Sequence, residues 1–129
     1  MITEDYVSFE TAKLLKEKGF DEPCERSYVG VEFTRSQGFN NSYYKTMYTD
    51  EQYRPISAPT LQMVMKWLRE VHNIDISIDI RFQTEDEDVY IKSWRYTVYH
   101  IDEIEDFGQL DTYEEACETA IKYCLENLI

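Results

Sequence analysis

The clearest structural signal in this chain is the run Ile74-Asp75-Ile76-Ser77-Ile78-Asp79-Ile80-Arg81-Phe82, in which apolar and polar residues alternate without exception. Successive side chains of a β-strand point to opposite faces of a sheet. The run therefore predicts a strand with one buried face and one solvated face. The acidic segment Thr84-Glu85-Asp86-Glu87-Asp88 follows it and predicts a turn.

A second strand is expected within Val89–Ile101, where two sets of large side chains have opposite parity. One set is Val89, Ile91, Tyr99 and Ile101, and the other is Tyr90, Trp94, Tyr96 and Val98. A β-bulge near Ser93 would bring both sets to the buried face. Without it, aromatic residues would lie on the solvated face and would mark an interface.

Two segments before this strand pair have the spacing of amphipathic helices. The first is Phe9–Lys18, for which Ser8 is a suitable N-cap and Gly19 a suitable left-handed terminator. The second runs from Pro59 or Thr60 to His72, with Asn73 as its terminator. Its continuous apolar stripe predicts the most buried helix of the chain.

A third helix is expected from Asp111 to about Leu128, where Asp111 and Glu114 match a D-x-x-E capping box. Cys117 and Cys124 lie seven residues apart in this helix, a rise of about 10.5 Å that is too long for a disulfide. With Cys24 far away in sequence, reduced thiols in a cytoplasmic protein are expected.

Two further strands are predicted near the first helix. Tyr28–Thr34 alternates with period two, and Tyr43–Tyr48 is rich in tyrosine and threonine, which favour strands. The segment 36–42 between them has the composition of a loop, so the pair suggests a hairpin. Asp102–Leu110 is acidic, contains Gly108 and is also interpreted as a loop.

The expected element order is therefore α-β-β-α-β-β-α. We expect a single α+β domain over residues 1–129, with a four-stranded antiparallel sheet and the helices packed on one face.

The composition excludes several classes of protein. The 129 residues carry a formal net charge of −13, and residues 85–129 hold 13 acids and 3 bases. A field of this sign repels nucleic acid and anionic membranes, so neither is expected as a partner. Hydrophobic residues make up 43% of the chain and aromatics 15%, which argues against a disordered acidic tail.

The start of the chain, Met1–Asp5, has acids where a signal peptide needs positive charge. No segment approaches the roughly 18 consecutive apolar residues of a membrane span. A cytoplasmic location without membrane insertion is expected.

The sequence offers no catalytic, cofactor-binding or metal-binding constellation. Its two histidines, His72 and His100, stand alone, and its four glycines are isolated rather than arranged in a phosphate-binding loop. Cys24 with a histidine is a formal nucleophile–base pair, but nothing in the sequence brings the two together. Tyrosines alternate with bases between Arg26 and Arg54, although the net charge there is only +1.

Three segments that cover the three predicted helices are Val7–Phe20, Ala58–Ile74 and Asp111–Ala116. Together they resemble small uncharacterised proteins of phages and prophages in gut Bacteroidetes. The resemblance implies a bacterial cytoplasmic setting and an origin in a mobile element. It implies no activity and no site residues.

The first functional hypothesis is a non-catalytic module that binds another protein. The chain has 11 tyrosines, which give contact area at low entropic cost. The predicted interface residues are Tyr43, Tyr44, Trp94, Tyr96 and Tyr99, and self-association through the Trp94/Tyr96 face is one form of this hypothesis.

The alternative is an inhibitor that mimics nucleic-acid charge, in which the acids between residues 85 and 118 occupy a basic groove of a host protein. An enzyme with an unrecognised site and a nucleic-acid binder using residues 26–54 complete the set of hypotheses.

Overall fold

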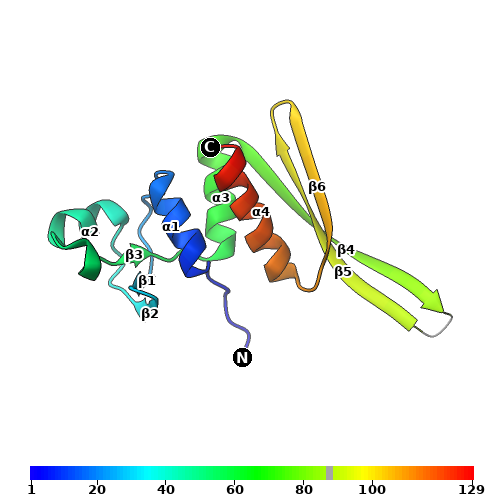
Figure 1. The fold of residues 1–129 in the computed structure, drawn as a ribbon, viewed down its shortest axis with the longest axis horizontal. Helices are drawn as coiled ribbons and strands as arrows, with labels where there is room; N and C mark the ends of the chain where they lie inside the picture. The colour runs from blue at the N-terminus through cyan, green and yellow to red at the C-terminus, as the bar shows by residue number, and fades with distance from the viewer. Residues whose placement is uncertain (87–88) are drawn as a thin grey trace. The chain divides into compact units, whose positions relative to one another are not determined.

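The isoleucine run forms strand β4 (Ile74–Asp86) of the computed structural model, which describes residues 1–86 and 89–129 (Figure 1). Strand β5 (Val89–His100) returns antiparallel to it, and β6 (Glu103–Leu110) pairs with β5, so the sheet order is β4-β5-β6. The predicted hairpin is confirmed. Residues 84–86, which were expected in the turn, belong to strand β4, and the last two residues of the predicted turn, Glu87 and Asp88, lie outside the described residues.

The α+β class is confirmed, but the expected single four-stranded sheet is wrong. Within the described residues the chain forms two three-stranded antiparallel sheets, one in each of two compact units, Met1–Met63 and Val64–Ile129. It also has four α-helices rather than three. The third strand of the second unit, β6, lies in the acidic segment Asp102–Leu110, where the sequence favours a loop. Aspartate and glutamate are rare in strands, but β6 lies at a sheet edge, where charged side chains are common.

The pairing of β4 with β5 settles the parity of β5. Ile76 lies opposite Val98, Ile78 opposite Tyr96 and Ile80 opposite Trp94. Directly opposed residues of antiparallel strands project on the same face, so Trp94, Tyr96 and Val98 share the isoleucine face.

The predicted bulge near Ser93 in β5 is absent. Ser93 lies directly opposite Arg81 without a register shift. The extra residue is in β6 instead, where Phe107 to Leu110 opposes Tyr96 to Trp94 and Gln109 has a φ of 67°.

Helix α4 (Tyr113–Asn127) packs against all three strands of this sheet (Figure 1). Its predicted apolar stripe is confirmed by six buried residues: Ala116, Cys117, Ala120, Ile121, Cys124 and Leu125. The N-cap is Thr112 rather than Asp111. The Thr112 hydroxyl accepts a hydrogen bond from the Glu115 N–H (3.0 Å), and the Glu115 carboxylate accepts one from the Asp111 N–H (3.3 Å).

Helix α3 (Leu61–His72) confirms the second predicted helix. The Thr60 hydroxyl accepts a hydrogen bond from the Met63 N–H (3.1 Å), and Asn73 adopts the left-handed conformation with a φ of 54°. Val64 and Leu68 of its apolar stripe are fully buried.

The first unit begins with helix α1 (Phe9–Glu17), which also agrees with the prediction. Ser8 caps it by accepting from the Thr11 N–H (3.2 Å). Gly19, with a φ of 92°, ends it in a Schellman motif, in which the Phe20 N–H donates to the Leu15 carbonyl (2.9 Å).

The sheet of the first unit differs from the predicted hairpin. Strands β1 (Arg26–Val29) and β2 (Glu32–Arg35) form a hairpin whose turn falls inside the segment Tyr28–Thr34 that was expected to be one strand, because Gly30 (φ 61°) allows a two-residue turn. A short strand, β3 (Ile56–Ser57), pairs with the other edge of β1.

The predicted strand Tyr43–Tyr48 is wrong, because this segment lies in helix α2 (Asn41–Met47). The Asn40 side chain caps the helix by accepting from the Tyr43 N–H (2.9 Å). A 3₁₀ turn, η1 (Glu51–Tyr53), connects α2 towards β3. Among the described residues, no helix has the length and apolar character needed to cross a membrane.

Candidate functional site

The predicted interface residues of the first unit lie together at helix α2. Tyr43 is 37% exposed and its ring stacks on Phe39, with ring centroids 3.9 Å apart. Tyr44 is only 3% exposed and meets Phe39 and Tyr43 edge to face. Of these two neighbouring tyrosines, Tyr43 therefore contributes exposed surface and Tyr44 contributes to the packing of the unit.

The predicted interface residues of the second unit do not share one surface. Tyr96 is 4% exposed and Trp94 is half-buried on the isoleucine face, where the Trp94 ring meets Tyr113 of α4 edge to face at 5.6 Å. Tyr99 projects from the opposite face and is 46% exposed. Trp94 and Tyr96 therefore contribute to the core beneath α4.

A groove of about 530 Å³ lies between the β1–β2 hairpin and α2. One wall is polar and includes Ser27, Thr34 and Arg35, and the other is aromatic and apolar, formed by Phe39, Tyr43, Tyr44, Met47 and Tyr48. Met47 is 59% exposed and Tyr48 is 42% exposed. The groove therefore presents accessible apolar surface beside one guanidinium group, and it holds the predicted pair of tyrosines.

Helix α2 is fixed in place by the side chains of Asn41, Ser42 and Asp21, which are not among the predicted site residues. The Asn41 amide is buried, donates to the Phe20 carbonyl (3.0 Å) and accepts from the Ser57 N–H (2.9 Å). Asp21 accepts from both the N–H and the hydroxyl of Ser42 in the first turn. A carboxylate is favourable at this positive end of a helix.

The loop that closes the groove is also tied to the sheet. The Ser36 hydroxyl donates to the Cys24 carbonyl (2.6 Å), and the Cys24 N–H donates to the Phe39 carbonyl (3.3 Å). Because both walls are held by side-chain and backbone hydrogen bonds, the groove is preformed. A helix predicted over residues 41–47 would also have predicted the aromatic wall of the groove, since Tyr44 and Tyr48 lie one helical turn apart.

The Tyr44 hydroxyl is a buried polar group without a hydrogen-bond partner among the described residues. A buried hydroxyl left without a partner costs about 1–3 kcal/mol relative to a paired one. This oxygen has almost no solvent-accessible surface, so a ligand lying in the groove does not reach it.

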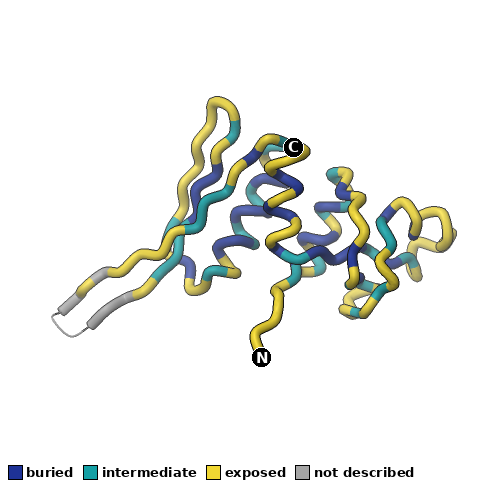
Figure 2. Tube along the Cα trace, turned by 180° about the vertical axis from the view of Figure 1, so that it is seen from behind, coloured by how far each residue is buried: buried dark blue, intermediate teal, exposed yellow. Residues whose placement is uncertain are grey.

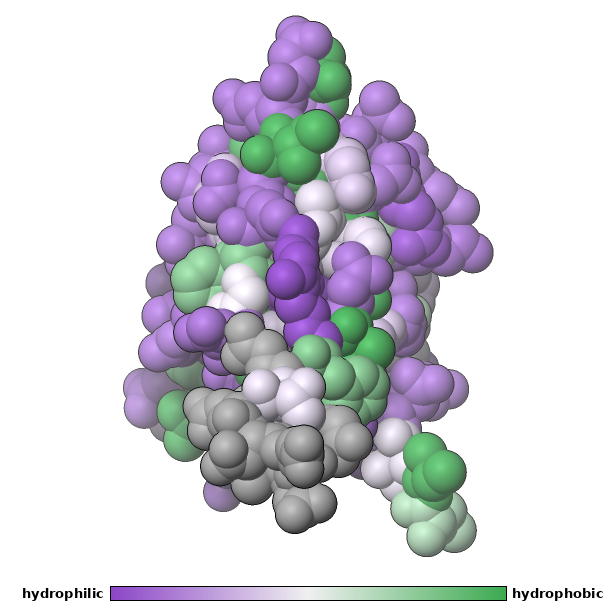
Figure 3. All heavy atoms as spheres, turned by 90° about the vertical axis from the view of Figure 1, so that its right-hand side faces the viewer, coloured by the Kyte–Doolittle hydropathy of each residue, from purple (hydrophilic) through white to green (hydrophobic). Residues whose placement is uncertain are grey.

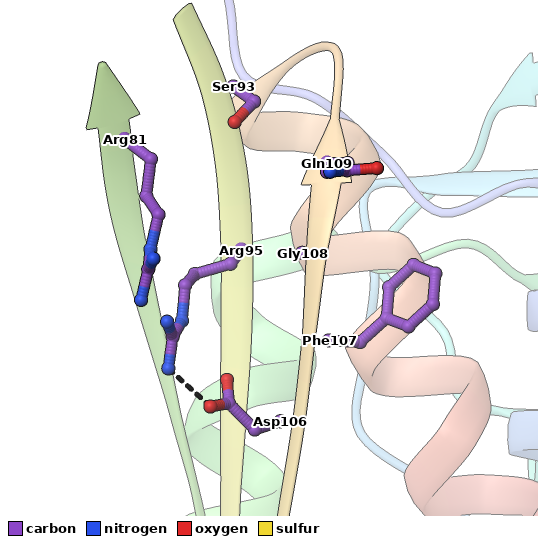
Figure 4. Close-up of a pocket in the computed structure, with 7 residues that line it drawn as sticks. All are labelled: Arg81, Ser93, Arg95, Asp106, Phe107, Gly108 and Gln109. Carbon is purple, nitrogen blue, oxygen red and sulfur yellow. Dashed lines mark hydrogen bonds and ion pairs between the residues drawn. The ribbon is translucent and has the colours of Figure 1, made fainter. Parts of the chain in front are cut away.

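A second hollow, of about 300 Å³, lies on the open face of the β4-β5-β6 sheet (Figure 4). Its lining includes Arg81, Arg95 and Asp106, and the dashed line in Figure 4 marks the ion pair between Arg95 and Asp106. The Thr97 hydroxyl also donates to the Asp106 carboxylate (3.3 Å). An anionic ligand would compete with Asp106 for Arg95, so this hollow is the weaker candidate site.

The acids of β6 are divided between two faces of the sheet. Glu103 and Glu105 lie opposite His100 and Val98 and share the isoleucine face, whereas Asp106 lies opposite Thr97 on the other face. A nucleic-acid mimic needs its carboxylates in one continuous array, and these three do not form one. The side of the molecule seen in Figure 3 carries separate hydrophobic patches between hydrophilic side chains.

The three cysteines are buried free thiols. Burial raises the pKa of Cys24 to about 12, an effect that the Ser57 hydroxyl opposes and the charge of Glu22 reinforces. Burial likewise raises the pKa of Cys124 to about 12. Both thiols are therefore protonated at neutral pH, which is the opposite of an activated nucleophile.

The Cys124 thiol makes stability sensitive to alkaline pH. Its pKa rises from 9.0 to about 12 on folding, so the neutral thiol favours the folded chain below about pH 9. Between pH 9 and 12 the unfolded chain loses the proton first, and this thiol is expected to lower the free energy of unfolding by up to about 1.4 kcal/mol per pH unit.

The check is thermal unfolding at a series of alkaline pH values for the natural chain and Cys124→Ala. The variant is less stable at neutral pH, and the gap between the two should narrow as the pH rises. A gap that stays constant to pH 12 would show that the thiol does not titrate in this window.

No family of proteins, curated protein or solved structure matches this chain. Within the residues that the structure describes, no three side chains among histidine, cysteine, aspartate and glutamate gather as metal ligands. The groove of the first unit is therefore the candidate functional site on its own geometry.

Proposed function

We propose that this chain is a non-catalytic protein-binding module whose groove takes an extended peptide segment of a partner protein. The observation that carries the proposal is the preformed groove between β1–β2 and α2, with an aromatic wall and a polar wall. Small binding sites of proteins combine largely apolar walls with a few placed polar groups, and this groove has that composition.

The aromatic wall favours a peptide in an extended conformation. Aromatic-lined grooves bind polyproline-type segments because such segments are already extended and lose little entropy on binding. The stacked pair Phe39–Tyr43 and the exposed side chains of Met47 and Tyr48 supply apolar contact area along the groove.

The polar wall favours an acidic residue in the bound segment. Arg35 is the charged residue of the described lining, and a guanidinium group binds a carboxylate in a two-pronged geometry. The chain as a whole carries a net charge of −13, which repels a polyanion such as a nucleic acid. A short peptide with one acid near Arg35 avoids that repulsion.

The experiment is selection of a random-peptide display library on the immobilised full chain, followed by synthesis of an enriched peptide. We expect apolar or proline residues around one acidic residue. Binding measured by fluorescence anisotropy is expected to weaken about ten-fold or more in Tyr43→Ala, because exposed aromatic residues dominate binding energies. Tyr53→Ala is the matched control, since Tyr53 is 61% exposed but does not line the groove.

Two further variants test the individual walls. Arg35→Gln is expected to weaken binding of the acidic peptide more than it weakens binding of a peptide in which the acid is replaced by its amide. Tyr44→Phe should leave stability unchanged or raise it by about 1 kcal/mol, because it removes an unpaired buried hydroxyl, and should leave peptide binding unchanged. The proposal fails if no enriched peptide distinguishes the natural chain from Tyr43→Ala.

A further inference from the structure

Strand β4 leaves one side of its backbone unpaired. It is an edge strand of the order β4-β5-β6, and among the described residues no strand pairs with its outer side. An edge of this kind presents free N–H and C=O groups that can accept another strand. Proteins usually protect such an edge with charged residues, so the charges of β4 decide which strand it can accept.

Of the four odd-numbered residues between positions 75 and 81 of β4, two are charged and lack an opposite charge across the sheet. Asp79 lies opposite Arg95, but Asp75 lies opposite Tyr99 and Arg81 lies opposite Ser93. Figure 4 shows that the dashed ion pair joins Arg95 to Asp106, with Arg81 standing apart on the edge strand. Asp75 and Arg81 are thus an acid and a base at opposite ends of one exposed face.

The other face of β4 carries exposed apolar side chains. The β4–β5 hairpin extends past α4 (Figure 1), and part of its described trace beyond the helix is coloured as exposed in Figure 2. Ile80 is 41% exposed and Phe82 is 64% exposed, whereas Ile74 at the other end of the strand is fully buried. The apolar face therefore continues beyond the helix that covers it.

We propose that β4 is a self-recognition edge, and that a second copy of this chain pairs with it antiparallel in a register centred on Ile78. In this register Asp75 of each copy lies opposite Arg81 of the other, so the two-fold axis creates the same ion pair twice. The two sheets become one continuous six-stranded sheet. This inference rests on the second unit alone and is independent of the peptide groove.

The charges of β4 exclude the neighbouring registers. Centring on Ser77 places Asp75 opposite Asp79, and centring on Asp79 or Arg81 places that residue opposite its own copy. Like charges directly opposite each other are destabilising. Centring on Ile80 pairs Arg81 with Asp79, which already has Arg95 opposite it, and gives Asp75 no base. The Ile78 register alone pairs both unmatched charges.

The same register also covers the exposed apolar face. A two-fold axis perpendicular to the sheet keeps the isoleucine faces of both copies on one side. Phe82 of one copy then lies opposite Ile74 of the other, and Ile80 lies opposite Ile76. The exposed distal side chains come beside the helix-covered end of the second copy, which removes apolar surface from water.

The test is the mass of the full chain in solution, measured by sedimentation velocity over a range of concentrations. The natural chain is expected to form a species of twice its 15.5 kDa mass. Asp75→Arg and Arg81→Asp each place like charges together at both pairs, and each is expected to weaken association about ten-fold or more. An equimolar mixture of the two variants is expected to restore the dimer, because every charged pair in the mixed dimer is complementary.

Asp79→Asn is the matched control, since it changes an acid on the same face that lies opposite Ser77 in this register. Its dimer should form as in the natural chain. Restoration in the mixture also shows that both single variants fold. The proposal is overturned if the natural chain stays monomeric at every concentration, if the mixture does not associate, or if Asp79→Asn abolishes the dimer. A monomer that still binds the selected peptide would overturn this inference and leave the proposed function intact.

Discussion

Asn41→Ala is expected to lower the free energy of unfolding of the first unit by about 2–4 kcal/mol. Asn41 is 8% exposed. Its side chain ties α2 to two other parts of the unit, because it donates a hydrogen bond to the Phe20 carbonyl after α1 and accepts one from the Ser57 N–H in β3. Alanine would remove both of these buried hydrogen bonds. The same change is expected to abolish peptide binding, since α2 forms one wall of the groove.

Urea unfolding followed by far-ultraviolet circular dichroism measures this effect. Both tryptophans, Trp67 and Trp94, lie in the second unit, so tryptophan fluorescence reports separately on that unit. Asn127→Ala is the matched control, because the Asn127 amide also donates to a backbone carbonyl (3.0 Å) but is exposed. Equal losses in the two variants would refute the bridging role of Asn41.

Ile121→Ala is expected to destabilise the second unit by about 2–5 kcal/mol. Ile121 is fully buried on α4, the helix that packs on the isoleucine face of the sheet. Removing three carbons there leaves a cavity that the surrounding side chains fill only in part. The expected readout is an earlier urea transition in tryptophan fluorescence.

Ile104→Ala is the control for this change, because Ile104 lies on β6 of the same sheet and is 70% exposed. The free energy of unfolding of Ile104→Ala should fall by less than about 1 kcal/mol, because differences in strand propensity between residues span about that range. If Ile121→Ala lowered the free energy of unfolding as little as Ile104→Ala does, α4 would not cover the sheet in solution.

Local rules were sufficient where one segment determines its own structure. The alternation of Ile74–Phe82 predicts β4, and the Ser8 and Asn73 signals predict a helix start and a helix end. In each case the deciding groups lie within a few residues of one another. These parts of the fold could therefore be predicted from the sequence.

The wrong predictions fall on segments whose structure is decided by residues far away in the sequence. The tyrosine-rich segment 43–48 favours a strand by composition, but Asp21 and Phe20, about twenty residues earlier, hold the first turn of α2 through Ser42 and Asn41. Strand β6 lacks regular alternation and forms because β5 offers it a paired edge. The groove depends on the long-range contacts that hold α2, so only its tyrosines were predicted. The origin in a bacterial mobile element stays a prediction.

The most direct test of the binding function is an ¹⁵N NMR spectrum of the full chain titrated with one selected peptide. The account predicts that amide signals of β2, the segment 36–39 and α2 shift together, with Arg35, Tyr43 and Met47 among them, while those of β4, β5 and β6 stay in place. Shifts confined to the second unit, or none at saturating peptide, would contradict it.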